Sequence, residues 1–268
     1  MRHALFVPPF GELAEPAAVV ELAVAAEGRG WDGLFLWDHI KRPPWEPAEV
    51  ADPWIVLAAV AAATTRLRLG PMITPLARRR PQKVARESVT LDRLSGGRLT
   101  LGVGLGVDTD GELGRFGEVT DDRLRADRLD EALDLLLALW SGDEVDHRGP
   151  HYRAEGVAFR PLPQQQPRIP VWCAARGEGA PRALRRAARL DGLFPVDTTP
   201  AQAGRMLERV AAIRGSLDGY DLALEAGPDT DPDDLVRAGA TWALTPVATG
   251  VSRREALAIV DRGPAASG

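Results

Sequence analysis

One feature limits the fold more than any other: short apolar runs alternate with longer segments of helical period along the chain. This alternation is typical of βα units that build a mainly parallel sheet. Eight such units are predicted, with strands at residues 4–7, 33–37, 67–73, 98–104, 169–175, 191–196, 220–227 and 241–247. Eight units within 268 residues are what a (β/α)8 TIM barrel needs. An open doubly wound sheet is the competing α/β architecture, because periodicity does not reveal the strand order.

The helices between these strands are predicted at residues 16–29, 52–64, 82–94, 121–140, 180–190, 200–214 and 252–260, with one more that begins at the sequence DPDDL. Asp52 is expected to cap the second of them, because Pro53 suits the first helical position. Residues 143–161 break the alternation, and their polar, Gly-rich sequence predicts a short hairpin or excursion outside the main sheet. No Ser/Gly linker divides the chain, so residues 1–268 are interpreted as a single domain.

Composition excludes several classes of function. Hydrophobic residues make up 45% and charged residues 26%, as in soluble globular proteins. The net charge of -5 is spread along the chain, which argues against a nucleic-acid partner. No apolar stretch is long enough for a membrane helix, and Pro8 and Pro9 interrupt the first apolar run, so a cytoplasmic protein with no membrane partner is expected.

Reactive thiols and metal sites are not predicted. Cys173, the one cysteine, lies in the apolar stretch IPVWCAA and is interpreted as a core residue rather than as a nucleophile. The four histidines show neither H-x-H nor H-E-x-x-H spacing, so no metal is expected.

The sequence LFLWDHIKRPPW, residues 34–45, places an acid and an imidazole at the end of a predicted strand. Catalytic groups of a barrel stand at this end of the strands. Asp38 and His39 are therefore either a hydrogen-bonded structural pair or an acid/base site in which the aspartate sets the state of the imidazole. Trp37, Trp45 and Trp54 lie in or near the following loop, either as a wall for a planar ligand or as packing of that loop.

Two glycine-containing loops are the other candidates for ligand contact. The run GVGLGVD, residues 102–108, allows close approach of backbone N–H groups to a ligand, although its spacing departs from a dinucleotide fingerprint. The run ARGEGAPRALRRAAR, residues 175–189, opens a predicted helix and carries Arg176 and Arg182, which favours a phosphate or carboxylate. An ordinary strand-to-helix loop with a basic solvent face is the alternative for the second run.

Taken together, these segments resemble the luciferase-like monooxygenase superfamily of flavin- and deazaflavin-dependent oxidoreductases. The matching segments are GWDGLFLWDH (30–39), DPWIVLAAVAAATTRLRLGPMITPL (52–76), RRPQKVARESVTLDRLSGGRLTLGVGLG (79–106), RLRADRLDEALDLLLALW (123–140) and PVWCAARGEGAPRALRRAARLDGLFP (170–195). They occur in the family's order over most of residues 30–195, whereas the last third of the chain matches only by its βα rhythm. The resemblance implies a TIM barrel that binds a reduced flavin or deazaflavin ring at the C-terminal ends of its strands.

The resemblance also implies roles for individual residues. It makes His39 the proton donor or acceptor, Asp38 the residue that orients it, and Trp45 a wall of the substrate pocket. The ring would be supported after the third strand, where a cis peptide bond is expected at Met72-Ile73. The cofactor-binding residues that it implies are Met72, Ile73, Thr74, Gly104, Leu105, Gly106, Val107, Ala174, Ala175, Arg176, Gly177, Glu178 and Gly179, of which the last six would hold the cofactor's phosphate.

Two positions depart from the family pattern. Trp45 stands one residue later than the expected tryptophan. Val107 occupies the place where the sugar-phosphate dehydrogenases of the family have a glutamate, so that particular dehydrogenase chemistry is in doubt.

The expected function is hydride transfer between coenzyme F-420 and a small organic substrate in a homodimer. An FMN-dependent monooxygenase that inserts oxygen, with a flavin reductase as partner, is the alternative. Two hypotheses from other functional classes also stay open. One is a barrel that binds a cofactor without catalysis, and the other is an isomerase or aldolase that acts on a phosphorylated substrate. The last of these lacks a candidate Schiff-base lysine, because Lys41 and Lys83 both lie in polar stretches.

Overall fold

The computed structural model describes residues 1–47, 49–178 and 180–264. Its main sheet has the strand order β3-β2-β1-β11-β10-β9-β8-β5-β4, and its neighbouring strands pair in parallel. The strands are β1 (Arg2–Val7), β2 (Gly33–Leu36), β3 (Arg68–Pro71), β4 (Thr74–Pro75), β5 (Leu101–Gly104), β8 (Val171–Arg176), β9 (Gly192–Val196), β10 (Asp221–Glu225) and β11 (Trp242–Pro246). β3 and β4 are two parts of the third predicted strand, and the expected cis bond at Met72-Ile73 lies between them.

The sheet curves until its two edges meet. The N–H of Leu69 on β3 donates to the carbonyl of Arg98 (3.1 Å), and the N–H of Thr100 donates to the carbonyl of Leu69 (2.9 Å). At Gly70 a Cβ would lie 1.8 Å from the Thr100 carbonyl oxygen, so only glycine permits this approach. The chain forms a nearly closed barrel, as the eight predicted units indicated, and not an open sheet.

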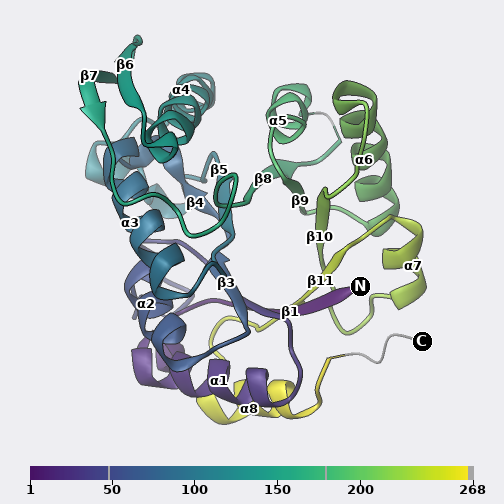
Figure 1. The fold of residues 1–268 in the computed structure, drawn as a ribbon. Helices are drawn as coiled ribbons and strands as arrows, with labels where there is room; N and C mark the ends of the chain where they lie inside the picture. Colours follow the sequence, from purple (N-terminus) through teal and green to yellow (C-terminus); the bar gives the residue numbers. More distant parts are fainter. Residues whose placement is uncertain (48, 179, 265–268) are drawn as a thin grey trace.

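Helices surround this barrel (Figure 1). They are α1 (Pro16–Gly28), α2 (Pro53–Ala63), α3 (Pro81–Leu94), α4 (Asp122–Ser141), α5 (Pro181–Ala187), α6 (Pro200–Arg214), α7 (Pro232–Arg237) and α8 (Arg253–Asp261). The predicted cap is confirmed, because the Asp52 carboxylate accepts from the N–H groups of Trp54 and Ile55. Short 3-10 helices lie in the connections at η1 (Gly11–Ala14), η2 (Leu76–Arg78), η3 (Thr109–Gly111) and η4 (Gly114–Phe116). α5 ends at Ala187, three residues before the predicted end.

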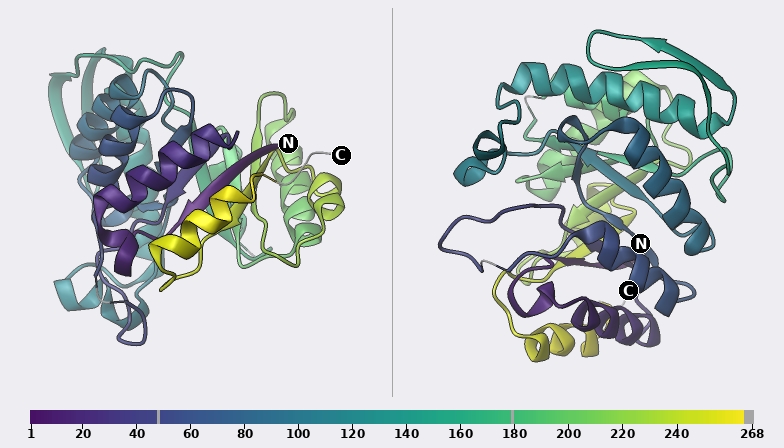
Figure 2. Two further views of the ribbon diagram at one scale, coloured as in Figure 1. Left: turned by 90° about the horizontal axis from the view of Figure 1, so that it is seen from below. Right: turned by 90° about the vertical axis from the view of Figure 1, so that its left-hand side faces the viewer.

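The excursion predicted at residues 143–161 is a hairpin. Its strands β6 (Glu144–Arg148) and β7 (Arg153–Ala158) pair antiparallel in a sheet of their own. The hairpin lies along the outer side of α4 (Figure 2, right), where the Glu131 carboxylate accepts from the N–H groups of His151 and Tyr152. It adds to the helical layer and leaves the barrel uninterrupted.

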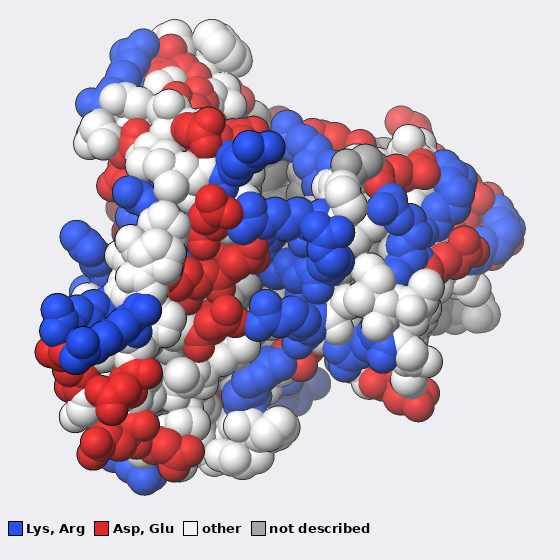
Figure 3. All heavy atoms as spheres, turned by 90° about the horizontal axis from the view of Figure 1, so that it is seen from above, with Lys and Arg blue, Asp and Glu red and all other residues white. Residues whose placement is uncertain are grey.

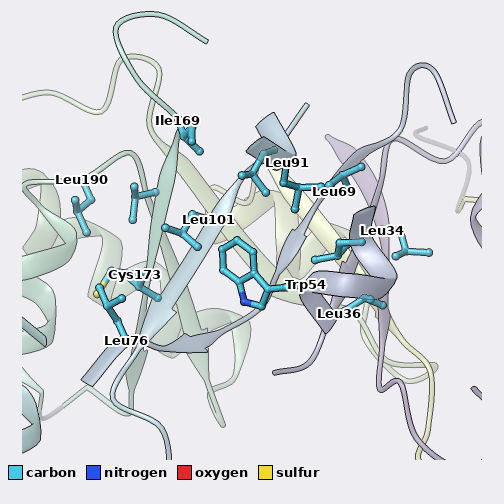
Figure 4. Packing of buried hydrophobic residues seen from close by; sticks show 14 of the residues in the cluster. Leu34, Leu36, Trp54, Leu69, Leu76, Leu91, Leu101, Ile169, Cys173 and Leu190 are labelled. Atoms are coloured by element: carbon cyan, nitrogen blue, oxygen red, sulfur yellow. The ribbon is translucent and has the colours of Figure 1, made fainter. Parts of the chain in front are cut away.

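Alternation along the strands divides the apolar residues into two cores. On β1, Leu5 and Val7 belong to the larger core between strands and helices, whereas Phe6 belongs to a smaller core inside the barrel. Figure 4 shows part of the larger core, with Trp54 among the leucines. Cys173 lies in this core, fully buried, and burial raises the pKa of its thiol to about 11, which agrees with its interpretation as a core residue.

Candidate active site

A cavity of about 400 Å³ opens at the C-terminal ends of the barrel strands. Loops after β2 and β5 and the last residues of β8, β9 and β10 contribute to its walls. The predicted site residues that line it are Asp38, His39, Met72, Ile73, Leu105, Gly106, Val107, Ala174 and Arg176. Segments more than a hundred residues apart in the sequence thus meet where a barrel places its chemistry.

The remaining predicted residues lie elsewhere. Trp45 is 75% exposed and does not line the cavity, whereas Trp37 does. Thr74 is buried and its hydroxyl donates to Asp38. Ala175 lines a neighbouring cavity, and Glu178 pairs with Arg205. Gly104 ends β5 behind the cavity and Gly177 lies in the loop after β8. Gly179 falls outside the described residues.

Asp38 has a structural role that the sequence did not reveal. Its carboxylate is 2% exposed and accepts from both neighbouring arginines, Arg78 (2.9 Å) and Arg79 (2.9 Å to each oxygen). Thr74 and Trp54 complete its set of donors. A buried carboxylate is stable only when it is paired in this way. Asp38 therefore links the end of β2 to the segment after β4 through these ion pairs. It is not the residue that orients His39.

The carboxylate that contacts His39 belongs to Glu112, which the sequence analysis missed. Glu112 is 3% exposed; its Oε2 lies 2.7 Å from His39 Nδ1, and its Oε1 accepts from the N–H of Ile40 (2.9 Å). A carboxylate at Nδ1 favours the tautomer with a proton on that nitrogen. The only signal available from the sequence was that Glu112 lies in the long loop after β5.

Arg42 closes the other side of the imidazole. One guanidinium nitrogen, Nη1, lies 3.3 Å and 3.2 Å from the two ring nitrogens of His39, so the guanidinium lies close to both of them. Its other nitrogens donate to Glu46 at 2.9 Å and 2.8 Å. The same guanidinium lies over the rings of Phe10 and Trp37. His39 is therefore held on several sides before any ligand binds.

Glycine allows the loop after β5 to lie against the β3–β4 segment. A Cβ on Gly104 would lie 1.9 Å from Ile73 Cδ1. Gly106 has a φ of +76°, and a Cβ there would lie 2.8 Å from the Cβ of Pro75. These two positions let backbone form one wall of the cavity, which suits a flat ligand.

A second cavity, of about 710 Å³, adjoins the first and lies between α4 and α5. The two cavities lie side by side and are together called the groove here; both are lined by Leu105, Gly106, Val107, Thr109, Ala174 and Arg176. Ion pairs link α4 to α5 and to the residues just after α5: Arg182 with Asp127 (2.7 Å) and Asp130 (2.6 Å), Arg186 with Asp130 (2.5 Å), and Arg189, two residues beyond α5, with Asp134. Figure 3 shows acidic and basic side chains next to one another on this side of the molecule. Arg182, one of the two arginines whose charge favours an anion at this loop, is thus already paired.

Opposite His39, the cavity carries two carboxylates, Asp197 after β9 and Glu225 at the end of β10. Arg176 pairs with Asp197 at 3.3 Å. Burial, together with the negative charge of Asp197, raises the pKa of the Glu225 carboxyl.

Two absences hold for residues 1–47, 49–178 and 180–264. Within these ranges no cluster of three or more His, Cys, Asp or Glu side chains is arranged to hold a metal ion. Nor does any helix there combine the length and apolar composition that a bilayer crossing requires.

Comparison with known proteins decides the family. The sequence profile of the luciferase-like monooxygenase family matches residues 1–241. The chain belongs to this family. A relative of this luciferase-like chain is the F-420-dependent glucose-6-phosphate dehydrogenase of Nocardia farcinica, 34% identical over 246 residues, which cover 85% of this chain and 70% of the relative.

Two solved structures share the fold of the luciferase-like chain. An F-420-dependent secondary alcohol dehydrogenase in complex with an F-420-acetone adduct superposes with a TM-score of 0.79 at 19% identity, covering 97% of each chain. The oxygenating constituent of a Baeyer-Villiger monooxygenase from Pseudomonas putida, in complex with FMN, superposes with a TM-score of 0.72 at 18% identity, covering 85% of this chain and 67% of that one. At these identities the likeness concerns the barrel alone.

Proposed function

We propose that this luciferase-like protein is an oxidoreductase that uses coenzyme F-420 to move a hydride to or from a small organic substrate. The observation that carries the proposal is the His39–Glu112 pair at the wall of a cavity of about 400 Å³. The glucose-6-phosphate dehydrogenase relative, named for F-420, supports the choice of cofactor.

The groove fits a flat ring with an elongated tail. The ring would lie on the wall formed by Met72, Ile73, Leu105, Gly106 and Val107, which packs closely because Gly104 and Gly106 have no Cβ to clash with Ile73 and Pro75. The tail and its phosphate would follow the groove past Ala174, Ala175 and Arg176 into the second cavity, with Gly177, Glu178 and Gly179 in the same loop. Coenzyme F-420 supplies two-electron hydride chemistry when bound. Thr74 would support this wall indirectly, through Asp38.

The chain's own residues would accept and donate a proton during the reaction. Glu112 binds the Nδ1 side of His39, so Nε2 would take the proton of a substrate hydroxyl or return it to a carbonyl, with Arg42 Nη1, 3.2 Å from Nε2, moving aside for the substrate. Arg42 and the Ile40 N–H fix the imidazole and its carboxylate in place. Phe6, Trp37 and Phe194 cover the cavity with apolar surface and exclude water from the reacting groups.

The experiment that tests the proposal is a parallel titration of the purified protein with F-420 and FMN, followed by tryptophan fluorescence and visible absorbance. Tighter binding of F-420 than of FMN supports the proposal. Tighter binding of FMN would turn the assignment toward the monooxygenase alternative with a flavin reductase partner. Binding without turnover on any acceptor would indicate a non-catalytic barrel, and binding of neither cofactor would leave the phosphate-substrate barrel.

A second test addresses His39 directly. We expect His39→Ala to lower kcat by about 100-fold or more, because general acid-base catalysis contributes on that order. Unchanged turnover with an unchanged pH profile would contradict the role. The proposal also keeps two expectations from the family resemblance, a cytoplasmic location and a homodimer, and sedimentation analysis of the holoenzyme tests the second.

A further inference from the structure

We infer that the substrate of this site is an uncharged alcohol or the corresponding carbonyl compound, with an apolar body, and not a phosphorylated sugar. This inference rests on the proposed function and specifies its substrate class. It is drawn from the walls of the cavity that remain for the substrate when the cofactor ring lies against the glycine-containing wall.

The first argument is the apolar surface. Four apolar residues face the cavity from three strand ends, namely Phe6 on β1, Trp37 after β2, and Phe194 and Val196 on β9. Phe6 contacts both Trp37 and Phe194 through its ring, with centroids 5.4 Å and 5.6 Å apart. Such a continuous aromatic wall favours a hydrocarbon body, which gains free energy when it leaves water.

The second argument is that the cations at the cavity are already neutralised. Among the described residues that line it, Arg42 donates to Glu46 and Arg176 pairs with Asp197, and no lysine contributes. His39 is held by Glu112. Recognition of a phosphate dianion takes charged donors that are free to form bidentate contacts. A phosphate dianion here would have to compete with the carboxylates of Glu46 and Asp197 for these guanidinium groups.

The third argument is the sign of the remaining charge. Glu225 stands at the end of β10 facing the cavity, and it makes no ion pair among the described residues. When ionised, Glu225 would repel a dianion, whereas its carboxyl group can hydrogen-bond to a hydroxyl. The raised pKa of Glu225 agrees with a carboxyl that lacks a cationic partner.

The test uses the holoenzyme with F-420 and no oxygen, after binding of F-420 has been measured separately. Cyclohexanol, isopropanol and glucose 6-phosphate are compared by the loss of the oxidised cofactor's absorbance. We expect kcat/KM for cyclohexanol to exceed that for glucose 6-phosphate by about 100-fold or more, the range in which a site with unsuited polar groups discriminates. Inorganic phosphate is expected not to compete with the alcohol.

The outcomes separate the two proposals. Failure of F-420 to bind overturns the proposed function and this inference with it. Binding of F-420 followed by preferred turnover of glucose 6-phosphate, or by no turnover of either alcohol, overturns the inference alone.

A charge reversal tests the mechanism of discrimination. We expect Glu225→Lys to raise the ratio of kcat/KM for glucose 6-phosphate to that for cyclohexanol by about tenfold, the effect of one favourable charge contact. Glu144→Lys on the hairpin makes the same charge change away from the cavity and is expected to leave the ratio as in the wild type. Glu225→Gln, which keeps the shape of the side chain, shows the same direction with a smaller change. An unchanged ratio in both Glu225 variants, with F-420 still bound, contradicts the inference.

Discussion

At the scale of single residues, the site depends on the Glu112 carboxylate, whose two oxygens contact two different groups. Glu112 binds the Ile40 N–H with one oxygen and faces His39 Nδ1 with the other. In Glu112→Gln, an amide NH2 group opposite Nδ1 would favour the tautomer whose proton is on Nε2, and a protonated Nε2 no longer accepts a proton. We expect kcat to fall by about 10- to 100-fold with F-420 affinity unchanged.

Steady-state kinetics across pH, combined with a cofactor titration, measures this effect. Glu118→Gln is the control, because Glu118 lies on the same loop and its carboxylate makes no hydrogen bond within the described part of the chain. Equal kcat values in the two variants would contradict a positioning role for Glu112.

Glu27 makes stability depend on pH. Partial burial would raise the pKa of its carboxyl, but the N–H groups of Arg66, Leu67 and Thr65 and the Thr65 hydroxyl donate to it and lower the pKa to about 2. A lowered pKa stabilises the fold above the ordinary value of 4.5, and this contribution is lost as the pH falls from there toward about 2. We expect Glu27→Gln to reduce the free energy of unfolding by about 1–2 kcal/mol at neutral pH, after allowance for solvent screening.

Urea denaturation at neutral and at acidic pH checks the expectation. The difference from the wild type should shrink as the pH approaches the pKa of Glu27. Glu15→Gln, at an exposed position just before α1, should show little difference at either pH. A difference that is independent of pH would mean that the carboxylate charge contributes nothing.

The position of His39 after a strand could be predicted from the sequence, but its contacts could not. The end of a strand is a local property of the apolar run before it, and His39 follows β2 as expected. Its carboxylate partner lies 73 residues away on an irregular loop, where no periodicity relates the two. For the same reason Asp38 was paired with its neighbour in sequence, although Arg78 and Arg79 bind it in the structure.

At the scale of elements, the contact between β3 and the start of β5 closes the barrel. The Cβ of an alanine at position 70 would lie 1.8 Å from the Thr100 carbonyl oxygen, which belongs to backbone and has little room to move. We expect Gly70→Ala to lower the free energy of unfolding by about 3 kcal/mol or more, as strain against a rigid neighbour does.

Thermal and urea denaturation measure this loss. The matched control is Gly28→Ala at the end of α1, where nothing lies within 4 Å of an added Cβ. There we expect stability to be unchanged or raised by about 0.5–1 kcal/mol, since alanine favours the helix. Equal stability of the two variants would contradict the prediction, because it would mean that the contact between β3 and the Thr100 carbonyl contributes no measurable free energy to the fold.

The helices and strands could be predicted because the period of apolar residues is a property of the local sequence. Two details of the strands could not be predicted. The third strand is divided at Met72, and the fourth begins at Leu101 rather than at Arg98 in the barrel sheet, because both depend on the contact across the closing edge. The end of α5 at Ala187 could not be predicted either, because the arginine- and alanine-rich sequence there contains no helix-stopping residue.

At the scale of the whole molecule, the hairpin is separable from the barrel. Glu144 and Ala158 are partners in the register of β6 and β7, so the two ends of the excursion lie side by side and a short turn can join them. None of its residues lines the main cavity. We expect replacement of residues 145–157 by a two- to four-residue Asn-Gly turn to lower stability by about 1–3 kcal/mol, because Val145 is buried.

Affinity for F-420 should stay within about twofold of the wild type, within the uncertainty of additive effects at distant sites. Fluorescence titration and denaturation of the same preparation give both numbers. Loss of cofactor binding in a folded variant would show that the hairpin supports the site.

The ion pairs near α4 and α5 make one side of the barrel more sensitive to salt than the rest. Most of the helical layer is fixed to the strands by apolar burial, which dissolved salt does not weaken. The exposed pairs Arg182–Asp127 and Arg189–Asp134, in contrast, are screened as ionic strength rises. One side of the groove is therefore bounded in part by contacts that salt weakens, whereas the His39–Glu112 pair, whose carboxylate is buried, is largely shielded from salt.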